Sequence, residues 1–315
     1  MAMTFNEKYT KSIKNLADID LPDFSKEDTN FFADFVELLA AFSNEDGVSY
    51  GDIQDRFFGE PDESNSPENN DANESFIDGI FDLIEERIAQ YGDSYPFSLK
   101  EGQVFVLKEG LSTNQKLYIF LLMSSSLDIF SAFNSELTTD FETLSLKTIQ
   151  SFLPNAIIKP FGKNSEYKGT AIEKIKKLAR DIGLPIREFE LNQIGDRNVQ
   201  ERGLDIVGWL PFADNCQNKV IFLCQCACGK NFESKQHDTR RFENYYEFYK
   251  TMPQHTMFIP YSLINPKDGK FYHSDYIEKG CLMFERLRIL NLISLDGSIF
   301  DRFKSKELIE KIQIR

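Results

Sequence analysis

Apolar residues recur with a helical period on both sides of a polar stretch in the first third of the chain. The apolar residues are Phe31, Phe32, Phe35, Leu38, Leu39 and Phe42 before that stretch, and Phe76, Ile77, Ile80, Phe81, Ile84 and Ile88 after it. Spacings of three and four residues are typical of amphipathic helices. The intervening stretch is rich in Pro, Asn and acidic residues and has no large apolar side chain, so we expect a disordered loop near residues 59–75.

A hairpin and a further helix are expected next. Residues 95–107 carry strand-forming residues on both sides of Glu101-Gly102, which is a turn signal, and residues 114–133 are predicted to be helical. Helix, short helix, helix and hairpin is the element order of a winged helix. We therefore predict a mainly helical, winged-helix-like N-terminal domain over residues 1–135.

The remainder of the chain alternates between helical and strand patterns. The predicted helices span residues 140–153, 171–182, 232–249 and 282–293, and the predicted strands span residues 156–161 and 256–260, with two more beginning near 203 and 220. This order indicates an α/β domain, or α+β for the chain as a whole, over residues 136–315.

Charge is distributed unevenly along the 315 residues, whose net charge is −14. Residues 1–111 hold 25 Asp/Glu and 8 Lys/Arg, whereas residues 112–315 hold 25 and 28. Excess acidity disfavours phosphate binding, but here it belongs to the N-terminal third and leaves the second domain close to neutral. The helix at 75–90 has four acidic residues against Arg87 alone, which favours protein docking over DNA recognition. A helical cap that only completes the core is an equal alternative.

Compartment and cysteine chemistry are constrained by composition. The first residues lack the apolar run of a signal peptide, and no window approaches the roughly 18 apolar residues of a membrane span, so we expect a cytoplasmic protein without a membrane partner. Five cysteines in a chain of this length do not indicate a disulfide framework. Cys224, Cys226 and Cys228 alternate along one predicted strand, about 6.6 Å apart, which is too wide for tetrahedral zinc. They are expected to be reduced apolar fillers.

Two adjacent predicted strands each carry one polar side chain suited to a metal. Asp205 lies near the start of the first strand and Gln225 near the end of the second, and Glu142 lies on the helix that precedes them. Carboxylate and amide oxygens are the ligands that magnesium prefers. Each residue also has a simpler structural interpretation, because Asp205 can cap a turn, Gln225 can satisfy backbone groups and Glu142 can favour a helix start.

The ordered elements around these residues resemble the αβββαβ core of the PD-(D/E)xK restriction-endonuclease-like superfamily. The resemblance covers residues 139–262 and is strongest to the Mrr-like variant, which places Gln at the usual Glu position. Residues 225–235 also resemble a Gln-Cys-Ala-x-Gly-x-x-Trp-x-x-Lys pattern of uncharacterised bacterial proteins, with Phe232 at the Trp position. Where the superfamily motif has its lysine, this chain has Ala227. Lys235 is our preferred substitute and Lys230 the second choice, although Lys235 taken alone is better explained as part of a solvated helix face.

The resemblance implies a Mg²⁺- or Mn²⁺-dependent endodeoxyribonuclease that acts on DNA in bacterial anti-phage defence or restriction. Its metal ligands would be Asp205, Gln225 and Glu142, with Lys235 as the catalytic amine. The acidic N-terminal domain would dock a protein partner, and a homodimer is a further expectation. The alternatives are a catalytically inactive nuclease fold that binds nucleic acid or a partner protein in a defence complex, and a structural adaptor acting through its acidic part.

Overall fold

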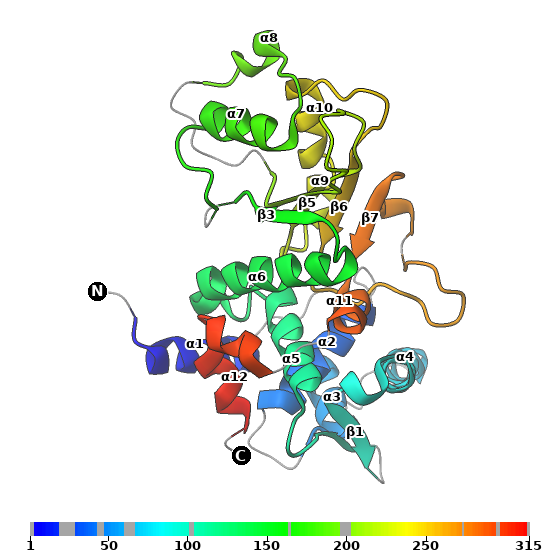
Figure 1. Ribbon diagram of the computed structural model, residues 1–315. Coiled ribbons are helices and arrows are strands. Elements are labelled where there is room, and N and C mark those ends of the chain that lie inside the picture. Colours follow the sequence, from blue (N-terminus) through cyan, green and yellow to red (C-terminus); the bar gives the residue numbers. More distant parts are fainter. Residues whose placement is uncertain are drawn as a thin grey trace. The chain divides into compact units, whose positions relative to one another are not determined.

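The computed structural model describes residues 3–18, 29–42, 47–59, 67–100, 104–162, 165–195, 203–272, 274–293 and 297–313. The chain forms two compact units (Figure 1). Unit 1 comprises Met1–Asp140, Tyr261–Lys270 and Leu295–Arg315, and unit 2 comprises Phe141–Pro260 and Phe271–Ser294. Within the described residues, no helix combines the length and apolar character that crossing a lipid bilayer requires.

Unit 1 is mainly helical. Its elements are α1 (Phe5–Asp18), α2 (Thr29–Phe42), α3 (Tyr50–Phe58), α4 (Pro67–Tyr91), η1 (Gly92–Ser94), β1 (Phe97–Lys100), β2 (Val104–Leu107), α5 (Thr113–Ser125), η2 (Ser131–Phe133), the start of α6 (Asn134–Phe152), η5 (Gly297–Arg302) and α12 (Lys306–Gln313). The strands β1 and β2 pair antiparallel, as expected for the hairpin. The expected turn at Glu101-Gly102 lies outside the described residues.

Two expectations for unit 1 need correction. Of the loop expected near residues 59–75, residues 60–66 lie outside the described residues, but Pro67–Ser75 forms the beginning of α4. Proline is well placed at a first helical position because the missing N–H would be unpaired there anyway, and polar residues can extend an amphipathic helix into solvent. The predicted helix 114–133 ends at Ser125, where the hydroxyls of Ser124 and Ser125 bond to preceding backbone carbonyls.

A buried ionic network lies inside unit 1. The Arg87 side chain, 1% exposed, pairs with Asp34 at 2.8 Å and with Glu37 at 2.7 Å. The hydroxyls of Tyr95 and Tyr118 each donate to Glu37 at 2.8 Å. Buried charges are tolerated when they are paired and hydrogen-bonded in this way. The network therefore joins α2, α4, α5 and the segment before β1.

The outer face of α4 is more acidic than the sequence alone indicates. Asp78, Asp82 and Glu85 are exposed, whereas Arg87, the only Lys or Arg in the sequence of this helix, is turned into the core. Such a face repels phosphate. The structure therefore argues further against DNA recognition by α4.

Unit 2 is built on a mixed sheet of five strands, so the chain is mixed α/β as predicted. The strands are β3 (Ile157–Pro160), β4 (Ile206–Trp209), β5 (Ile221–Cys226), β6 (Gln254–Phe258) and β7 (Cys281–Phe284), in that order across the sheet. The β3–β4 and β4–β5 pairs are antiparallel, and the β5–β6 and β6–β7 pairs are parallel.

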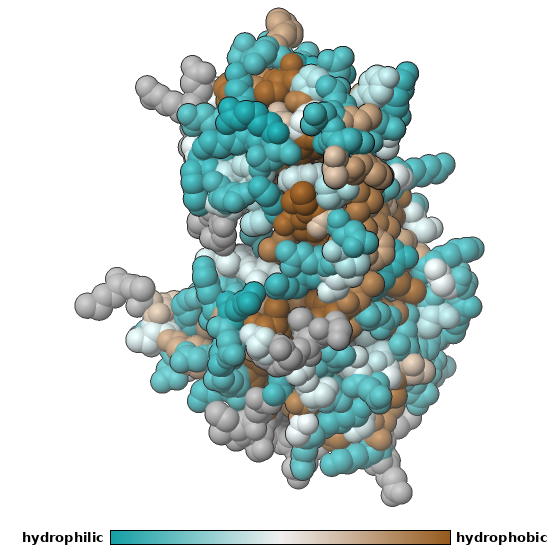
Figure 2. All heavy atoms as spheres, in the orientation of Figure 1, coloured by the Kyte–Doolittle hydropathy of each residue, from teal (hydrophilic) through white to brown (hydrophobic). Residues whose placement is uncertain are grey.

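Two helices cover opposite faces of this sheet (Figure 1). On one face, α7 (Ala171–Ile182) buries its apolar side in a cluster that includes Val207 and Leu223, while its outer side is hydrophilic (Figure 2). On the other face lies the second half of α6, where the Phe152 ring contacts Phe284 of β7 with centroids 5.2 Å apart. The sheet is thus sandwiched between helices, and α6 brings its first unit 2 residues, including Glu142, to the strands.

Two predicted helices of unit 2 differ in the structure. The helix expected at 232–249 is divided into α9 (Phe232–Lys235), η3 (Asp238–Arg241) and α10 (Phe242–Tyr245), because Tyr246 leaves the helix to form a bridge with Ile186. The helix expected at 282–293 is strand β7 followed by α11 (Arg286–Leu292). Glu285 caps α11 by accepting from the Arg288 amide, so it separates the two elements. The short elements α8 (Glu188–Leu191) and η4 (Ser274–Tyr276) complete the unit.

The buried side chain of His255 is expected to make the free energy of unfolding depend on pH. His255 on β6 contacts the Thr239 hydroxyl through Nδ1 at 2.9 Å and Glu243 through Nε2. Burial lowers the pKa of His255, against the opposite effect of Glu243 and with a smaller lowering effect of Arg240. The neutral ring satisfies both neighbours, because Thr239 donates to Nδ1 and Nε2–H donates to Glu243.

We therefore expect the free energy of unfolding to fall as the pH drops below about 6.5, the usual pKa of histidine, since the unfolded chain then binds a proton that the folded chain resists. Urea denaturation at pH 7.5 and 5.5 measures the change. His255→Gln removes this titrating group and should flatten the slope, whereas equal slopes in both proteins would contradict the assignment.

Candidate active site

Asp205 lies just before β4 and is bonded to β5 on both sides of Gln225. Its amide donates to the Cys224 carbonyl at 3.0 Å, and its Oδ2 accepts from the Cys226 amide at 2.8 Å. The predicted placement of Asp205 and Gln225 on neighbouring strands is therefore present in the fold. A carboxylate anchored by a backbone N–H has a fixed direction, so Asp205 is held rigidly.

The carboxylates of Asp205 and Glu142 converge over Gly162. A Cβ atom placed on Gly162 would lie 3.5 Å from Oδ1 of Asp205 and 3.6 Å from Oε2 of Glu142. The Gly162 amide also donates to the Asp205 carbonyl at 3.1 Å. Two acids from distant parts of the sequence thus face one spot, and the missing side chain of Gly162 leaves space between them.

Lys235 belongs to the same electrostatic neighbourhood. Burial raises the pKa of the Cys228 thiol, and the charge of Glu142 raises it further, whereas Lys235 lowers it and Asp205 raises it again. The pKa of the Cys228 thiol therefore responds to the charges of Glu142, Asp205 and Lys235. Lys235 is half-buried while Lys230 is exposed, which favours Lys235 as the amine near the acids.

Gln225 is 7% exposed and makes a single amide contact, from Nε2 to Oδ2 of Asp238 at 3.1 Å. Its Oε1 is buried and finds no hydrogen-bond donor among the described residues. A buried acceptor without a partner is costly, on the order of 1–3 kcal/mol.

These side chains fit magnesium better than zinc. Magnesium is commonly held by one or two carboxylates together with waters, and Asp205 and Glu142 can supply the carboxylates. Within the described part of the chain, no three His, Cys, Asp or Glu side chains are grouped so as to hold a metal by themselves. The oxygen set that the structure brings together is thus the two carboxylates of Asp205 and Glu142.

The cysteines behind the site are not joined by disulfide bonds. Cys216, Cys224, Cys226, Cys228 and Cys281 are all outside any disulfide. Burial raises the pKa values of Cys224, Cys226 and Cys228, and nearby carboxylates raise them further. The thiols are therefore neutral near pH 7, which agrees with the prediction that they pack as small apolar residues.

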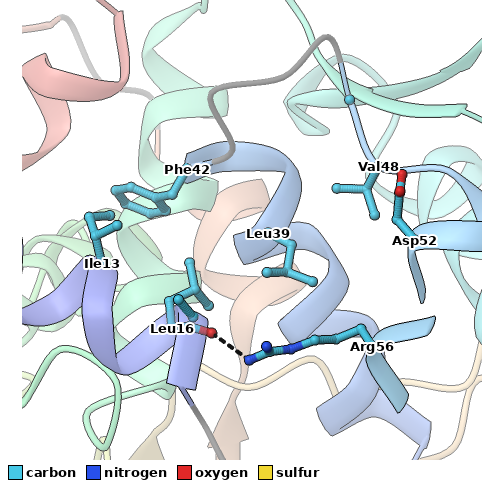
Figure 3. A pocket seen from close by; sticks show the side chains of 9 residues that line it. Ile13, Leu16, Leu39, Phe42, Val48, Asp52 and Arg56 are labelled. Carbon is cyan, nitrogen blue, oxygen red and sulfur yellow. Dashed lines mark hydrogen bonds between the residues drawn. The ribbon is translucent and has the colours of Figure 1, made fainter. Parts of the chain in front are cut away.

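Unit 1 contains an apolar pocket of about 330 Å³ (Figure 3). It is lined by Ile13, Leu16, Ala17, Leu39, Phe42, Gly47, Val48, Asp52 and Arg56. Its charged groups serve local structure, because Asp52 completes the capping box of α3 with Ser49 and Arg56 donates to the Leu16 carbonyl. We therefore place the candidate chemistry in unit 2.

Two lysines of α7 are engaged in contacts within unit 2. On α7, Lys176 pairs with Glu188 at 3.0 Å and Lys177 donates to the Lys168 carbonyl at 2.6 Å.

The sequence interpretation missed Asp238 and Gly162. Asp238 had the i,i+3 spacing to Arg241 that is typical of a solvated helix face, and Gly162 stood in a polar loop without any motif.

The structure brings three of the four predicted site residues together in unit 2. Glu142 and Asp205 meet over Gly162, and Lys235 acts on the same thiol as both acids. Gln225 alternates along β5 with Ile221 and Leu223, which pack in the cluster under α7, and it bonds Asp238. Its side chain therefore lies on the face of the sheet opposite α6, so the expectation that it joins the two carboxylates is not met. No family model, curated protein or solved structure matches this chain, and the assignment of the site therefore depends on this geometry.

Proposed function

We propose that the chain is a metal-dependent nuclease that hydrolyses phosphodiester bonds in DNA, with its site in unit 2. The observation that carries the proposal is the convergence of Glu142 and Asp205 over Gly162, beside β5. The element order supports it, because helix α6, strands β3, β4 and β5, the helical segment from α9 to α10 and strand β6 follow one another, with α7 and α8 inserted between β3 and β4, and the PD-(D/E)xK resemblance implies helix, three strands, helix and strand.

The residues have separate roles in this proposal. Asp205 and Glu142 would hold Mg²⁺ or Mn²⁺, and the bound ion would supply Lewis acidity and a water of lowered pKa. Asp205 keeps its direction through the Cys226 amide. Lys235 orients the attacking water and stabilises negative charge on the phosphate.

Lys235 replaces the lysine that the superfamily motif would place at residue 227. Ala227 is buried, and its amide donates to the Phe258 carbonyl at 2.9 Å, so this position continues the strand pairing of β5 and β6. The amine therefore comes from α9 instead.

Ala227 also favours a second candidate function, a nuclease fold that binds DNA without cutting it.

Under either function, the acidic face of α4 makes unit 1 the unit that docks a protein partner, which fits a complex in bacterial anti-phage defence or restriction. Two-strand cleavage would further require a homodimer.

Degradation of a supercoiled plasmid with Mg²⁺ or Mn²⁺ tests the function. We expect Lys235→Ala to lower the cleavage rate by roughly 100-fold or more, as for loss of a proton-transfer or charge-stabilising group. Lys230→Ala, the matched control on the same segment, should cut like the unsubstituted protein. DNA binding without any cleavage by the unsubstituted protein would favour the second function, and neither binding nor cleavage would reject both.

A further inference from the structure

Gly162 lacks a side chain at the point where a side chain would meet both acids. A Cβ atom there would lie 3.5 Å from Oδ1 of Asp205, 3.6 Å from Oε2 of Glu142 and 3.7 Å from the Cα of Asp205. These separations are ordinary van der Waals contacts, so a methyl group would enter without displacing either acid. The space beside the two carboxylates is therefore large enough for one methyl group.

The backbone does not require glycine at residue 162. The φ angle of Gly162 lies outside the left-handed region that favours glycine. Gly203 in the same unit shows the contrast, because its φ is +82° and a Cβ atom on it would lie only 2.4 Å from the Cβ of Asp238. The fold thus needs glycine at residue 203, whereas alanine fits both the φ angle and the space at residue 162.

Hydrogen bonds fix the walls of this space. The amides of Phe161 and Gly162 both donate to the Asp205 carbonyl, at 2.7 and 3.1 Å. The Ser165 amide donates to the Gly162 carbonyl at 3.1 Å, and Oδ2 of Asp205 accepts from the Cys226 amide. Because the backbone is held on both sides, the chain cannot easily move away from Asp205 to make room for a side chain and an ion together.

Glycine at residue 162 therefore lowers stability relative to alanine. Alanine at a compatible position restricts the unfolded chain and so stabilises the folded one. A residue that costs stability, where neither its φ angle nor its described neighbours require it, is expected at a functional site. The benefit of glycine here is the space that it leaves beside Asp205 and Glu142.

We propose that Gly162 is kept without a side chain so that a divalent cation can reach both carboxylates. The inference rests on the proposed function and adds to its site a residue that contributes no ligand atom. An ion bound at about 2.1 Å to one oxygen of each acid keeps further ligands, usually waters. A methyl group 3.5 and 3.6 Å from the same two oxygens takes the room that the ion and these waters need.

Calorimetric titration of the full chain with Mn²⁺ alone, without DNA, tests the inference together with thermal melting of the same proteins. We expect Gly162→Ala to weaken Mn²⁺ binding by about 10-fold or more, the scale of changes to the surroundings of metal ligands. Its melting temperature without Mn²⁺ should equal or exceed that of the unsubstituted protein, because alanine restricts the unfolded chain.

Gly195→Ala is the matched control. Gly195 also belongs to unit 2 and has a φ angle outside the left-handed region, but a Cβ atom on it would meet none of the described residues within 4 Å. The same substitution therefore adds a methyl group without filling the space beside the acids. It should leave Mn²⁺ binding unchanged.

The outcomes separate this inference from the proposed function. Equal Mn²⁺ affinity for Gly162→Ala and the unsubstituted protein, together with loss in Asp205→Ala, would overturn the role of Gly162 and leave the metal site intact. A melting temperature lowered by more than about 5 °C, or failure of Gly162→Ala to fold, would show that the fold needs this glycine and would also overturn the inference. Mn²⁺ binding that follows the expected pattern without plasmid cleavage would support the inference and reject the nuclease. No Mn²⁺ binding by the unsubstituted protein would reject both.

Discussion

Asp205→Ala is expected to abolish metal-dependent cleavage of DNA. The Asp205 carboxylate both anchors to β5, through the Cys226 amide, and faces Glu142 over Gly162. Removal of an outer partner of a metal site costs about 10- to 100-fold, so removal of a carboxylate ligand should lower the cleavage rate by at least about 100-fold. Plasmid degradation with Mg²⁺ measures the rate.

Two companion variants make this result interpretable. Asp205→Asn keeps an oxygen that can accept from the Cys226 amide, so it should preserve the fold while still losing cleavage. Asp214→Ala removes an exposed carboxylate from the segment that links β4 and β5 and should cut normally. Cleavage by Asp205→Ala at the rate of the unsubstituted protein would contradict the site.

Arg87→Met is expected to cause the largest loss of stability. The substitution keeps a long apolar side chain but leaves Glu37, which is 0% exposed, and Asp34 without their cation. Breaking a buried pair by removing one partner typically costs about 3–5 kcal/mol. Urea denaturation of the full chain should show this decrease in the free energy of unfolding.

The matched control is Lys267→Ala, which removes an exposed ion pair with Glu86 of the same helix α4 and should leave the unfolding curve almost unchanged. The double variant Arg87→Met with Glu37→Gln should be more stable than Arg87→Met, because the amide oxygen of Gln can still accept from Tyr95 and Tyr118. A loss below about 1 kcal/mol for Arg87→Met would contradict the prediction, because it would show that removing the guanidinium leaves no costly buried charge in the network.

Local signals in the sequence were sufficient for some elements. The helix predicted at 171–182 has those bounds in the structure, because Thr170 forms a capping box with Glu173 and Gly183 ends the helix in the left-handed conformation. The strands on both sides of the predicted hairpin were also marked, by alternation and by turn residues. Where caps and periodicity agree, local sequence determines the element.

Elements that depend on distant contacts could not be predicted in the same way. The predicted helix at 232–249 breaks where Asp238 turns toward Gln225 and Tyr246 pairs with Ile186, and neither partner is a near neighbour in sequence. The apolar run at 282–293 has no period that separates a buried strand from a buried helix. Likewise, no local pattern shows that residues 261–270 belong to unit 1.

The candidate site was predictable only in part for the same reason. Asp205 and Gln225 could be placed together because they lie on consecutive strands. The meeting of Glu142 with Asp205 depends on Gly162, which has no side chain and no motif to mark it. Asp238 could not be identified from the sequence, because its contact with a residue of β5 arises only in the tertiary fold. Its three-residue spacing to Arg241 is typical of a surface ion pair.

Anomalous diffraction from crystals of the full chain soaked in Mn²⁺ tests the central claim most directly. The account predicts one strong peak about 2.1 Å from the carboxylate oxygens of Asp205 and Glu142, and its loss in Asp205→Ala crystals. A Mn²⁺ peak elsewhere in the chain, with none between Asp205 and Glu142, would contradict it.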